Sequence, residues 1–573
     1  TLANVFAEVK LPLNLTYKIT AAANLLYRQE KYAYPQISLT NPKTGVQTPM
    51  GNIPTRGVKQ IAANAVNLTN FHTLNFVKQV GDHSINALGG FSIERFDEGD
   101  FDAYNQGYLG NELTELDAGS TAPEVGGTSS QSRLQSYFGR VNYGFRDKYI
   151  LEANIRYDGS SRFAKGKRWG LFPSFSGAWR ISQEAFLANA NWISNLKLRA
   201  SWGRLGNQEI PLFSYINAIS LGQGYSFNNN VVGGTAITQL TDPTITWETT
   251  TMTNLGVDLD LFQNKLSFQL DAFDKTTNEI LRQVNIPAQV GKLEGPYRNI
   301  GKVSNKGIEF SLAYQDQVGA FRYRIGGNVA YLKNKVLDVK GNIYYDGVTI
   351  IRKGDAISSF YGLQSDGIFQ NDAEVTAHAY QAASTQPGDI RYIDQNGDNV
   401  IDNNDRIVIG SSIPTYTYGF TFNGSYKSFD LDLFFQGVAG VDTYANGNLA
   451  FPYRNGAGVT NEWLSNSWTP ENPTATLPRL TTSSGYPQNY LTSDYWIKNA
   501  SYLRLKNIQL AYNFQTEWLQ QLHIKRAKIF VNAQNYLTIT DFKLGDPERN
   551  LARAAMIDYP NYKSITAGIN ISI

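Results

Sequence analysis

The sequence predicts an all-β fold, namely a transmembrane, antiparallel, up-and-down β-barrel. Three observations lead to this prediction. Many segments alternate apolar and polar residues, the connections between them alternate between short and long, and the composition is rich in tyrosine, phenylalanine and glycine. Together these features are typical of a chain that crosses a membrane with strands.

The composition also excludes several other classes of protein. Of the 573 residues 13% are aromatic, and the chain has 50 glycines but 0 cysteines. No segment approaches the roughly 18 consecutive apolar residues that a membrane-spanning helix needs. Without cysteine, disulfides and thiolate chemistry are excluded. The net charge of +2 is close to neutral and predicts no nucleic-acid partner.

The alternation is clearest in residues 255–261. Leu255 and Val257 belong to an apolar series at odd positions, and Asp258 and Asp260 belong to a polar series at even positions. Successive side chains of a strand point to opposite faces, so the period of two separates an apolar face from a polar one. We expect the odd positions to face lipid, and Asp258 and Asp260 to face the lumen as pore-lining residues, in the same way as Asp430 and Asp432.

The same pattern repeats along the chain and predicts about 17 strands, each with boundaries good to about two to four residues. The predicted strands are 3–10, 13–30, 66–80, 83–96, 133–145, 148–160, 168–181, 194–205, 250–262, 265–284, 300–315, 320–335, 413–426, 428–442, 500–514, 526–540 and 563–573.

Loop lengths separate a barrel from a soluble β-sandwich, which alternation alone does not. Short links alternate with long ones such as 97–131, 206–248, 336–412 and 443–499. An up-and-down barrel has short periplasmic turns at one rim and long extracellular loops at the other. The links at 161–167 and 182–193 are of middling length and fit this pattern poorly.

The order of the links also makes a prediction about the chain ends. The last predicted strand follows a long link and therefore runs towards the periplasm, and counting back places residue 1 at the extracellular rim. Single-chain bacterial barrels have an even number of strands. We therefore expect residues 1–573 to be one barrel domain that is incomplete at its N-terminus.

Short segments in a fixed order carry a resemblance to a known family. They are YDGSSRF (157–163), FPS (172–174), AWR (178–180), LKLRASWG (196–203), GNQ (206–208), WETT (247–250), NIG (299–301), NKG (305–307), SFYG (359–362), DGIF (366–369), PGDI (387–390), YLRLKN (502–507) and DPE (546–548). In this order the sequence from about residue 133 to the end resembles the TonB-dependent SusC/RagA outer-membrane transporters.

The resemblance implies a plugged barrel of about 22 strands, a number found in outer-membrane transporters. It would leave about five strands, the plug and the TonB box outside this sequence. It also implies a bacterial outer-membrane location, active import driven through the TonB complex, and a SusD-like surface lipoprotein as a lid. The implied cargo is an oligosaccharide or an oligopeptide.

One segment, 394–405, has the spacing of a calcium-binding loop. Ca²⁺ prefers six to eight oxygen ligands, and a loop of 12 residues can supply them at fixed positions. Position 6 is Asn399 instead of glycine, and position 12 is an aspartate instead of glutamate. The alternative is a solvated acidic turn. The ligands that we predict are Asp394, Asn396, Asp398, the Val400 carbonyl, Asp402 and Asp405.

Catalytic patterns are absent from the sequence, and we predict no enzyme. The four histidines, at 72, 83, 378 and 523, have no metal-ligand spacing. Aromatic residues in the long loops could instead stack on sugar rings or peptide side chains, or could simply pack within a large loop. They include Tyr444, Phe451, Tyr453, Trp463, Trp468 and Tyr486.

The sequence thus predicts an active importer of oligosaccharides or oligopeptides in the outer membrane. Two alternatives remain at this stage, a passive porin and a soluble β-rich protein that binds glycans at the cell surface.

Overall fold

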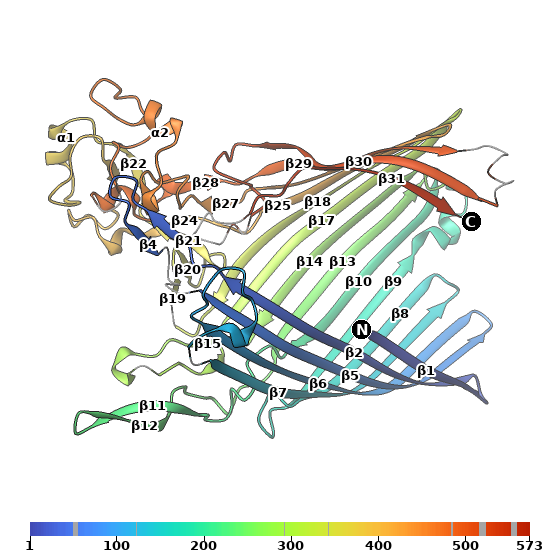
Figure 1. Cartoon of the computed structure of the whole chain (residues 1–573). Helices are drawn as coiled ribbons and strands as arrows, with labels where there is room; N and C mark the ends of the chain where they lie inside the picture. The colour runs from blue at the N-terminus through green and yellow to red at the C-terminus, as the bar shows by residue number, and fades with distance from the viewer. Residues whose placement is uncertain are drawn as a thin grey trace. The chain divides into compact units, whose positions relative to one another are not determined.

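The computed structural model describes residues 1–49, 56–121, 123–291, 293–341, 343–482, 485–514, 519, 523–549, 551 and 559–572. Within these residues, seventeen strands belong to one antiparallel sheet (Figure 1), which confirms the predicted fold class and strand number. Ile573, the last residue of the last predicted strand, lies outside the described residues.

The seventeen strands are β1 (Leu2–Leu11), β2 (Leu15–Tyr34), β5 (Gly57–Val80), β6 (His83–Gln106), β7 (Glu124–Phe145), β8 (Tyr149–Ser160), β9 (Trp169–Arg180), β10 (Ile193–Asn207), β13 (Glu248–Leu261), β14 (Leu266–Asn278), β17 (Lys302–Val318), β18 (Phe321–Asp338), β25 (Tyr416–Tyr426), β26 (Phe429–Ala439), β29 (Tyr502–Phe514), β30 (Arg526–Thr540) and β31 (Ser564–Ser572).

Shorter elements lie in the connections. They are β3 (Ser38–Thr40), β4 (Gln47–Pro49), β11 (Ile219–Phe227), β12 (Asn230–Ile237), β15 (Leu281–Gln283), β16 (Tyr297–Asn299), β19 (Tyr344–Asp346), β20 (Thr349–Ile351), β21 (Ser359–Gly362), β22 (Ser365–Ile368), α1 (Asp372–Ala377), β23 (Ile390–Tyr392), β24 (Ile407–Gly410), β27 (Asp442–Tyr444), α2 (Asn461–Asn466) and β28 (Ile497–Asn499). No helix in the described ranges is long and apolar enough to cross a membrane.

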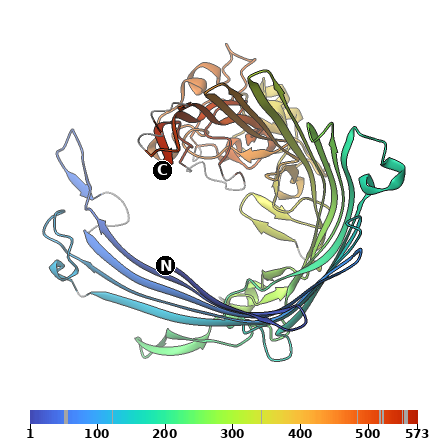
Figure 2. The ribbon, with the colours of Figure 1, turned by 90° about the vertical axis from the view of Figure 1, so that its right-hand side faces the viewer.

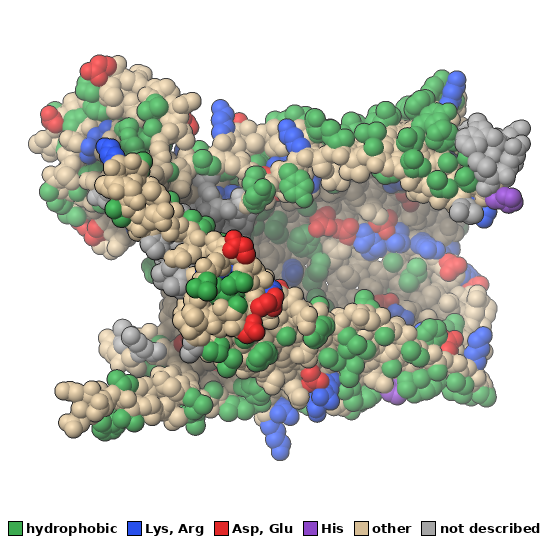
Figure 3. Space-filling view, in the orientation of Figure 1, with side chains coloured by type: hydrophobic (Ala, Val, Ile, Leu, Met, Phe, Trp, Pro, Cys, Tyr) green, Lys and Arg blue, Asp and Glu red, His purple; other side chains and the backbone are tan. Residues whose placement is uncertain are grey.

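The chain divides into two compact units, and the first comprises 1–177, 203–250 and 279–299. Its strands β1, β2, β5, β6, β7 and β8 pair in that order, each antiparallel to the next. In Figure 3 hydrophobic side chains cover much of the visible face of β5, β6 and β7. Strands β5 and β6 each have 24 residues, more than twice the roughly 9–11 that cross a bilayer.

This extra length is the main difference from the predicted strands. The predictions began β5 at residue 66 and ended β6 at 96, whereas Gly57 in fact pairs with Gln106. Outside the hydrocarbon layer a strand needs no apolar stripe, because its outer face contacts water instead of lipid. The added part of β7 reads EVGGTSSQS and has almost no apolar residues, so the alternation marks only the membrane part of these strands.

The second unit comprises 178–202, 251–278 and 300–573. Its strands from β14 to β31 pair in chain order: β14, β17, β18, β25, β26, β29, β30 and β31. Most of these strands lie close to their predicted bounds, and β30 starts and ends at the predicted residues, but β14 ends at Asn278, six residues before the predicted 284. Leu255 is 60% exposed on one face of β13 and Asp258 is buried on the other, as the alternation predicts.

The alternation of short and long links is also confirmed. Short turns such as 81–82, 262–265 and 427–428 alternate along the chain with long loops such as 339–415 and 440–501. In an antiparallel sheet successive links lie at opposite ends of the strands. The two links of middling length fit this alternation by their place in the chain. The link 161–168 stands where a long loop is expected, and the link 181–192 stands where a short turn is expected.

Aromatic rings line the short-turn end of the strands within each unit. In the second unit Phe321 stacks on Tyr323, and Tyr512 contacts Phe429 and Phe514, with ring centroids 5.0–5.4 Å apart. All five belong to the apolar face of their strands. Such a belt marks the interface between lipid and water.

Candidate functional site

Paired charges cross the polar face of the second unit. Arg199 on β10 lies between two carboxylates, with its Nη2 2.8 Å from Oδ1 of Asp258 and 3.0 Å from Oδ2 of Asp271. Lys197 Nζ lies 2.8 Å from the other oxygen of Asp258. Asp260, next on this face, accepts a hydrogen bond from the Asn195 amide. The result is a polar ladder across β10, β13 and β14.

The other two predicted pore-lining acids are likewise hydrogen bonded on the polar face. Asp430 accepts hydrogen bonds from Ser425 at 2.7 Å and Asn513 at 2.6 Å. Asp432 accepts one from Asn423 at 2.7 Å. These partners suit a polar wall.

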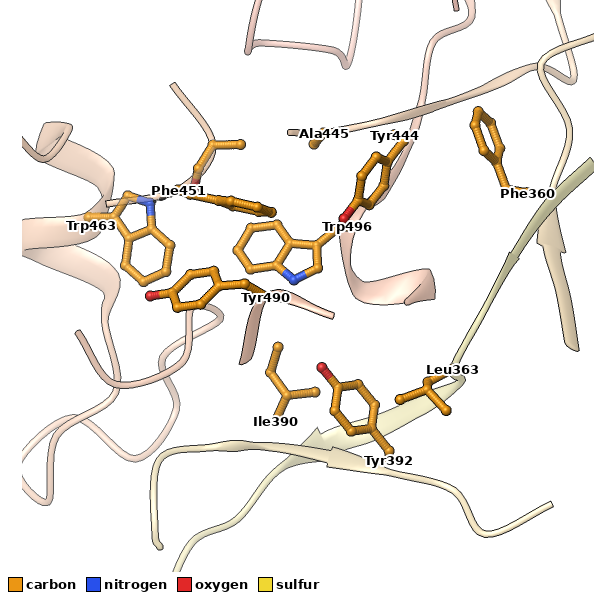
Figure 4. Close-up of a cluster of buried hydrophobic side chains, with 11 residues drawn as sticks. Phe360, Leu363, Ile390, Tyr392, Tyr444, Ala445, Phe451, Trp463, Tyr490 and Trp496 are labelled. Carbon is orange, nitrogen blue, oxygen red and sulfur yellow. Dashed lines mark hydrogen bonds between the residues drawn. The ribbon is translucent and has the colours of Figure 1, made fainter. Parts of the chain in front are cut away.

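The long loops 339–415 and 440–501 fold around a shared hydrophobic core (Figure 4). Trp496 is at its centre, only 2% exposed, and its indole N–H donates to the Asn489 carbonyl at 2.9 Å. The ring centroids of Phe451 and Tyr490 lie 4.7 and 6.0 Å from that of Trp496. An ordered loop domain therefore stands on the long-loop end of these strands.

This core decides what most of the loop aromatics do. Five of the six aromatic residues singled out from the sequence are at most 8% exposed, and Tyr453 is the exception at 45%. Of the two interpretations that the sequence left open, packing within the loop domain therefore holds for these five, and stacking on cargo does not. The five are Tyr444, Phe451, Trp463, Trp468 and Tyr486.

A buried carboxylate, which the sequence did not single out by itself, organises the same domain. Asp389 is fully buried and pairs with the Arg479 guanidinium. It also accepts hydrogen bonds from the Asn489 amide and the Gln386 backbone N–H, both at 2.9 Å. Gly388, with φ of +89°, lets the chain pass against the Trp468 ring, where a Cβ would come within 2.4 Å. This explains the PGDI segment as a folding device.

Two other segments behind the family resemblance also meet in space. Arg504 of YLRLKN is 4% exposed and binds both acids of DPE, Asp546 at 2.6 Å and Glu548. Lys506 adds a second ion pair to Glu548, at 2.8 Å. These contacts fix the last long loop onto β29.

In the first unit, WETT plays a similar role. The Trp247 ring packs against Phe163 and Phe172, with centroids 5.4 and 5.3 Å apart. Its N–H donates to the Arg168 carbonyl at 2.7 Å. Asn299 of NIG donates to the Thr246 carbonyl at 2.8 Å, so the segments join as one small core.

The predicted calcium loop is well ordered. Asp394 accepts hydrogen bonds from the backbone N–H groups of Gly397 and Asn399, at 2.7 and 2.8 Å. Desolvation opposes the charged form of Asp394, but these donors outweigh it and hold the pKa of Asp394 below its ordinary value. Asn399 has φ of +62°, the left-handed conformation that glycine usually supplies at this position.

The remaining acids of the loop also accept backbone N–H groups. Asp398 accepts from Val400 at 2.9 Å, and Asp402 from Asn404 at 2.6 Å. Asp405 is fully buried and accepts from Gln395 and Asp402, which closes the loop. Among the described residues no group of three or more His, Asp or Glu side chains is arranged as a metal site. Calcium binding therefore stays a prediction.

The histidines lie apart, as expected. His72 and His83 contact Tyr17 and Tyr143 on strands of the first unit, at 2.7 and 2.8 Å. His378 and His523 belong to the second unit, in different links. They form no common site.

Comparison with known proteins agrees with this architecture. Residues 4–536 match the family described as TonB dependent receptor-like, beta-barrel. TonB-dependent receptor P26 of Formosa agariphila is 31% identical over 89% of the chain and 53% of the relative. TonB-dependent receptor SusC of Bacteroides thetaiotaomicron is 29% identical over 83% of the chain and 47% of the relative. The chain thus spans about half the length of the curated relatives it matches.

A solved structure extends the similarity to the whole chain. The RagAB peptide transporter superposes with a TM-score of 0.83 and 25% identity, covering 100% of this chain and 61% of the other.

Proposed function

Because the chain belongs to the TonB-dependent receptor-like β-barrel family, we propose that it forms the barrel of an active importer of oligosaccharides or oligopeptides. The family consists of outer-membrane transporters and not of enzymes. Within it, the resemblance to SusC and RagA seen in the sequence is confirmed. The cargo, the energy source and the partners of this protein are the subject of the proposal.

The observation that carries the proposal is the folded loop domain at the long-loop end. Two long loops form a common hydrophobic core around Trp496, so they make an ordered domain at this end of the strands. Such a rigid domain suits the docking of a lid and the capture of a large cargo. The polar ladder around Arg199 supplies a charged wall on the same unit's strands.

The proposed partners are the TonB complex, which supplies energy through the inner membrane, and a SusD-like surface lipoprotein, which lids the barrel. The similarity to RagAB, a two-protein transporter, supports the lid. The test is purification of the tagged transporter from its native membrane. A SusD-like lipoprotein should copurify in equal amount, and its absence under mild detergent would contradict this part.

Uptake of labelled oligomers tests active import against a passive porin. Import should stop in cells that lack TonB or are treated with a proton uncoupler, while surface binding continues. Import that continues unchanged in both would favour the porin.

The cargo class is a separate question. The solved relative RagAB is a peptide transporter, which favours oligopeptides, whereas the family resemblance also admits oligosaccharides. Uptake of a labelled oligopeptide and of a labelled oligosaccharide, each with and without an excess of the unlabelled compound, distinguishes the two. Only the labelled compound of the true cargo class should be imported, and only an unlabelled compound of that class should reduce its import.

We also propose that the 394–405 loop holds a structural Ca²⁺ through Asp394, Asn396, Asp398, the Val400 carbonyl, Asp402 and Asp405. The spacing of donors and the left-handed Asn399 support this ion. Asp394 and Asp405 each also accept two backbone N–H groups, which hold the loop in the shape that the ion would need.

A further inference from the structure

A small sheet in the 339–415 loop carries a cavity of about 300 Å³. Strands β19, β20, β21 and β24 form the sheet, and the β19–β20 hairpin projects on the concave side of the strands of its unit (Figure 2). Tyr345, Tyr361, Asn403 and Arg406 line the cavity, together with Gly347 and Thr349. Its volume is at the lower end for a ligand pocket and fits one residue of an oligomer.

The two tyrosines provide the apolar surface of this cavity. Their rings lie on one face of the sheet, with centroids 5.8 Å apart and planes inclined by 51°. Tyr345 is 62% exposed, unlike the aromatics of the loop core. Tilted, accessible tyrosine rings can contact a sugar ring or an aliphatic side chain and still offer their hydroxyl groups.

Arg406 provides the charge, and it lacks a partner. Its Nε is buried, and among the described residues the guanidinium makes no hydrogen bond or ion pair. The preceding acid, Asp405, is already engaged by two backbone N–H groups. By contrast, Arg352 on the neighbouring strand end is paired with Asp355 at 2.7 Å. A guanidinium that lines a cavity without a counter-ion can pair with an anion that enters the cavity.

We propose that Tyr345, Tyr361, Asn403 and Arg406 form a cargo subsite for a residue that bears a carboxylate beside a ring or an aliphatic face. A guanidinium binds a carboxylate with two parallel N–H bonds, which favours this anion over a neutral group. The carboxylate can come from a uronate sugar or from an acidic amino acid, depending on the cargo. The inference rests on the proposed function as an importer of oligomers.

Calorimetry on the purified transporter in detergent tests the subsite. The probes are trigalacturonate and an alanyl-glutamyl-alanine tripeptide that is acetylated and amidated at its ends, each with a counterpart that lacks the carboxylate, namely the carboxyl-reduced trisaccharide and the equally blocked glutamine tripeptide. One acidic probe should bind at least about 10-fold more tightly than its neutral counterpart, the gain expected of a charge-assisted pair. Which acidic probe binds identifies the source of the carboxylate.

Variants locate the effect. Arg406→Gln should abolish the preference, Arg406→Lys should keep part of it, and Tyr361→Leu should weaken the acidic and neutral probes alike. Lys353→Gln removes an exposed cation of the same loop and should change nothing. Failure of both acidic probes to bind, or a preference that survives Arg406→Gln, overturns the subsite. TonB-dependent uptake by the wild type is measured separately, so the proposed function can stand when the subsite fails.

Discussion

Arginine substitutions on the apolar face of β13 should show how deep each position of the strand lies in the membrane. Val257 lies four residues and Leu255 six residues from Leu261, where β13 ends in a short turn. A strand rises about 3.3 Å per residue, and a tilt of about 45° reduces this to roughly 2.3 Å along the membrane normal. Val257 and Leu255 are then about 9 and 14 Å from the rim, either side of the middle of an apolar band about 25 Å tall.

The expected cost follows from these depths. Arginine on the lipid face costs about 2–4 kcal/mol at the midplane and about 0–1 kcal/mol near the interface. Val257→Arg and Leu255→Arg should therefore each cost about 2–4 kcal/mol, and Leu261→Arg at most about 1 kcal/mol. On the opposite face, Asp258→Asn should cost about 1 kcal/mol, because Arg199 keeps its second carboxylate and the partly exposed Lys197 loses one partner.

Urea unfolding of the transporter in lipid vesicles measures these free energies, and heat-modifiable mobility in gels checks that each variant assembles. The reasoning is refuted if Val257→Arg and Asp258→Asn destabilise equally. It is also refuted if Leu261→Arg costs as much as Leu255→Arg, since the assignment of faces or of depth would then be wrong.

Three further predictions concern the loop domain. Replacing Asp394 and Asp398 together by alanine should remove Ca²⁺ and increase limited proteolysis within 371–390, as a chelator should in the wild type; cleavage that ignores the chelator would favour a plain acidic turn. Asp389→Asn should destabilise the loop core by about 2–4 kcal/mol, because it leaves a largely buried guanidinium without its carboxylate, and thermal unfolding of the loop domain measures this. Burial raises the pKa of Asp442, so the folded state binds its proton more readily and this carboxyl group adds stability as pH falls through that raised pKa. Asp442→Asn should therefore raise the melting temperature at neutral pH, and the gain should shrink on acidification; a gain that is independent of pH would contradict this.

The membrane part of the fold was predictable because lipid imposes a simple rule on each strand. Where a strand crosses the bilayer, one face must be apolar, and so β30 could be bounded to the residue. The rule does not apply above the membrane, and there β5 and β6 extend 9 and 10 residues beyond their predicted ends, from 66 back to Gly57 and from 96 on to Gln106. Those extensions depend on pairs such as Gly57 and Gln106, which are 49 positions apart at the open end of a hairpin, and such pairing leaves no local pattern.

The loop domain was less predictable for the same physical reason. Whether an aromatic residue in a long loop is buried depends on which other loop covers it, and Trp496 is buried by residues from both 339–415 and 440–501. Asp389 shows the same limit, because its partners Arg479 and Asn489 are 90 or more positions away. The spacing of acidic residues identified the 394–405 loop, but it could not show that Asp405 accepts hydrogen bonds from the backbone N–H groups of Gln395 and Asp402.

Several of the segments that carry the family resemblance form contacts that hold the fold together. Arg504 pairs with Asp546, and Trp247 donates a hydrogen bond to the backbone at Arg168. Each of these contacts fixes the position of a loop, and neither indicates what passes through the barrel. In the proposed subsite Tyr361 belongs to SFYG, one of these segments, and the rest of the selectivity is expected of residues outside them. Tyr345 and Arg406 are such residues, and neither is needed for the hydrogen bonds that hold the loop core together. A transporter built in this way can change its cargo without changing its fold, because different residues support the two properties.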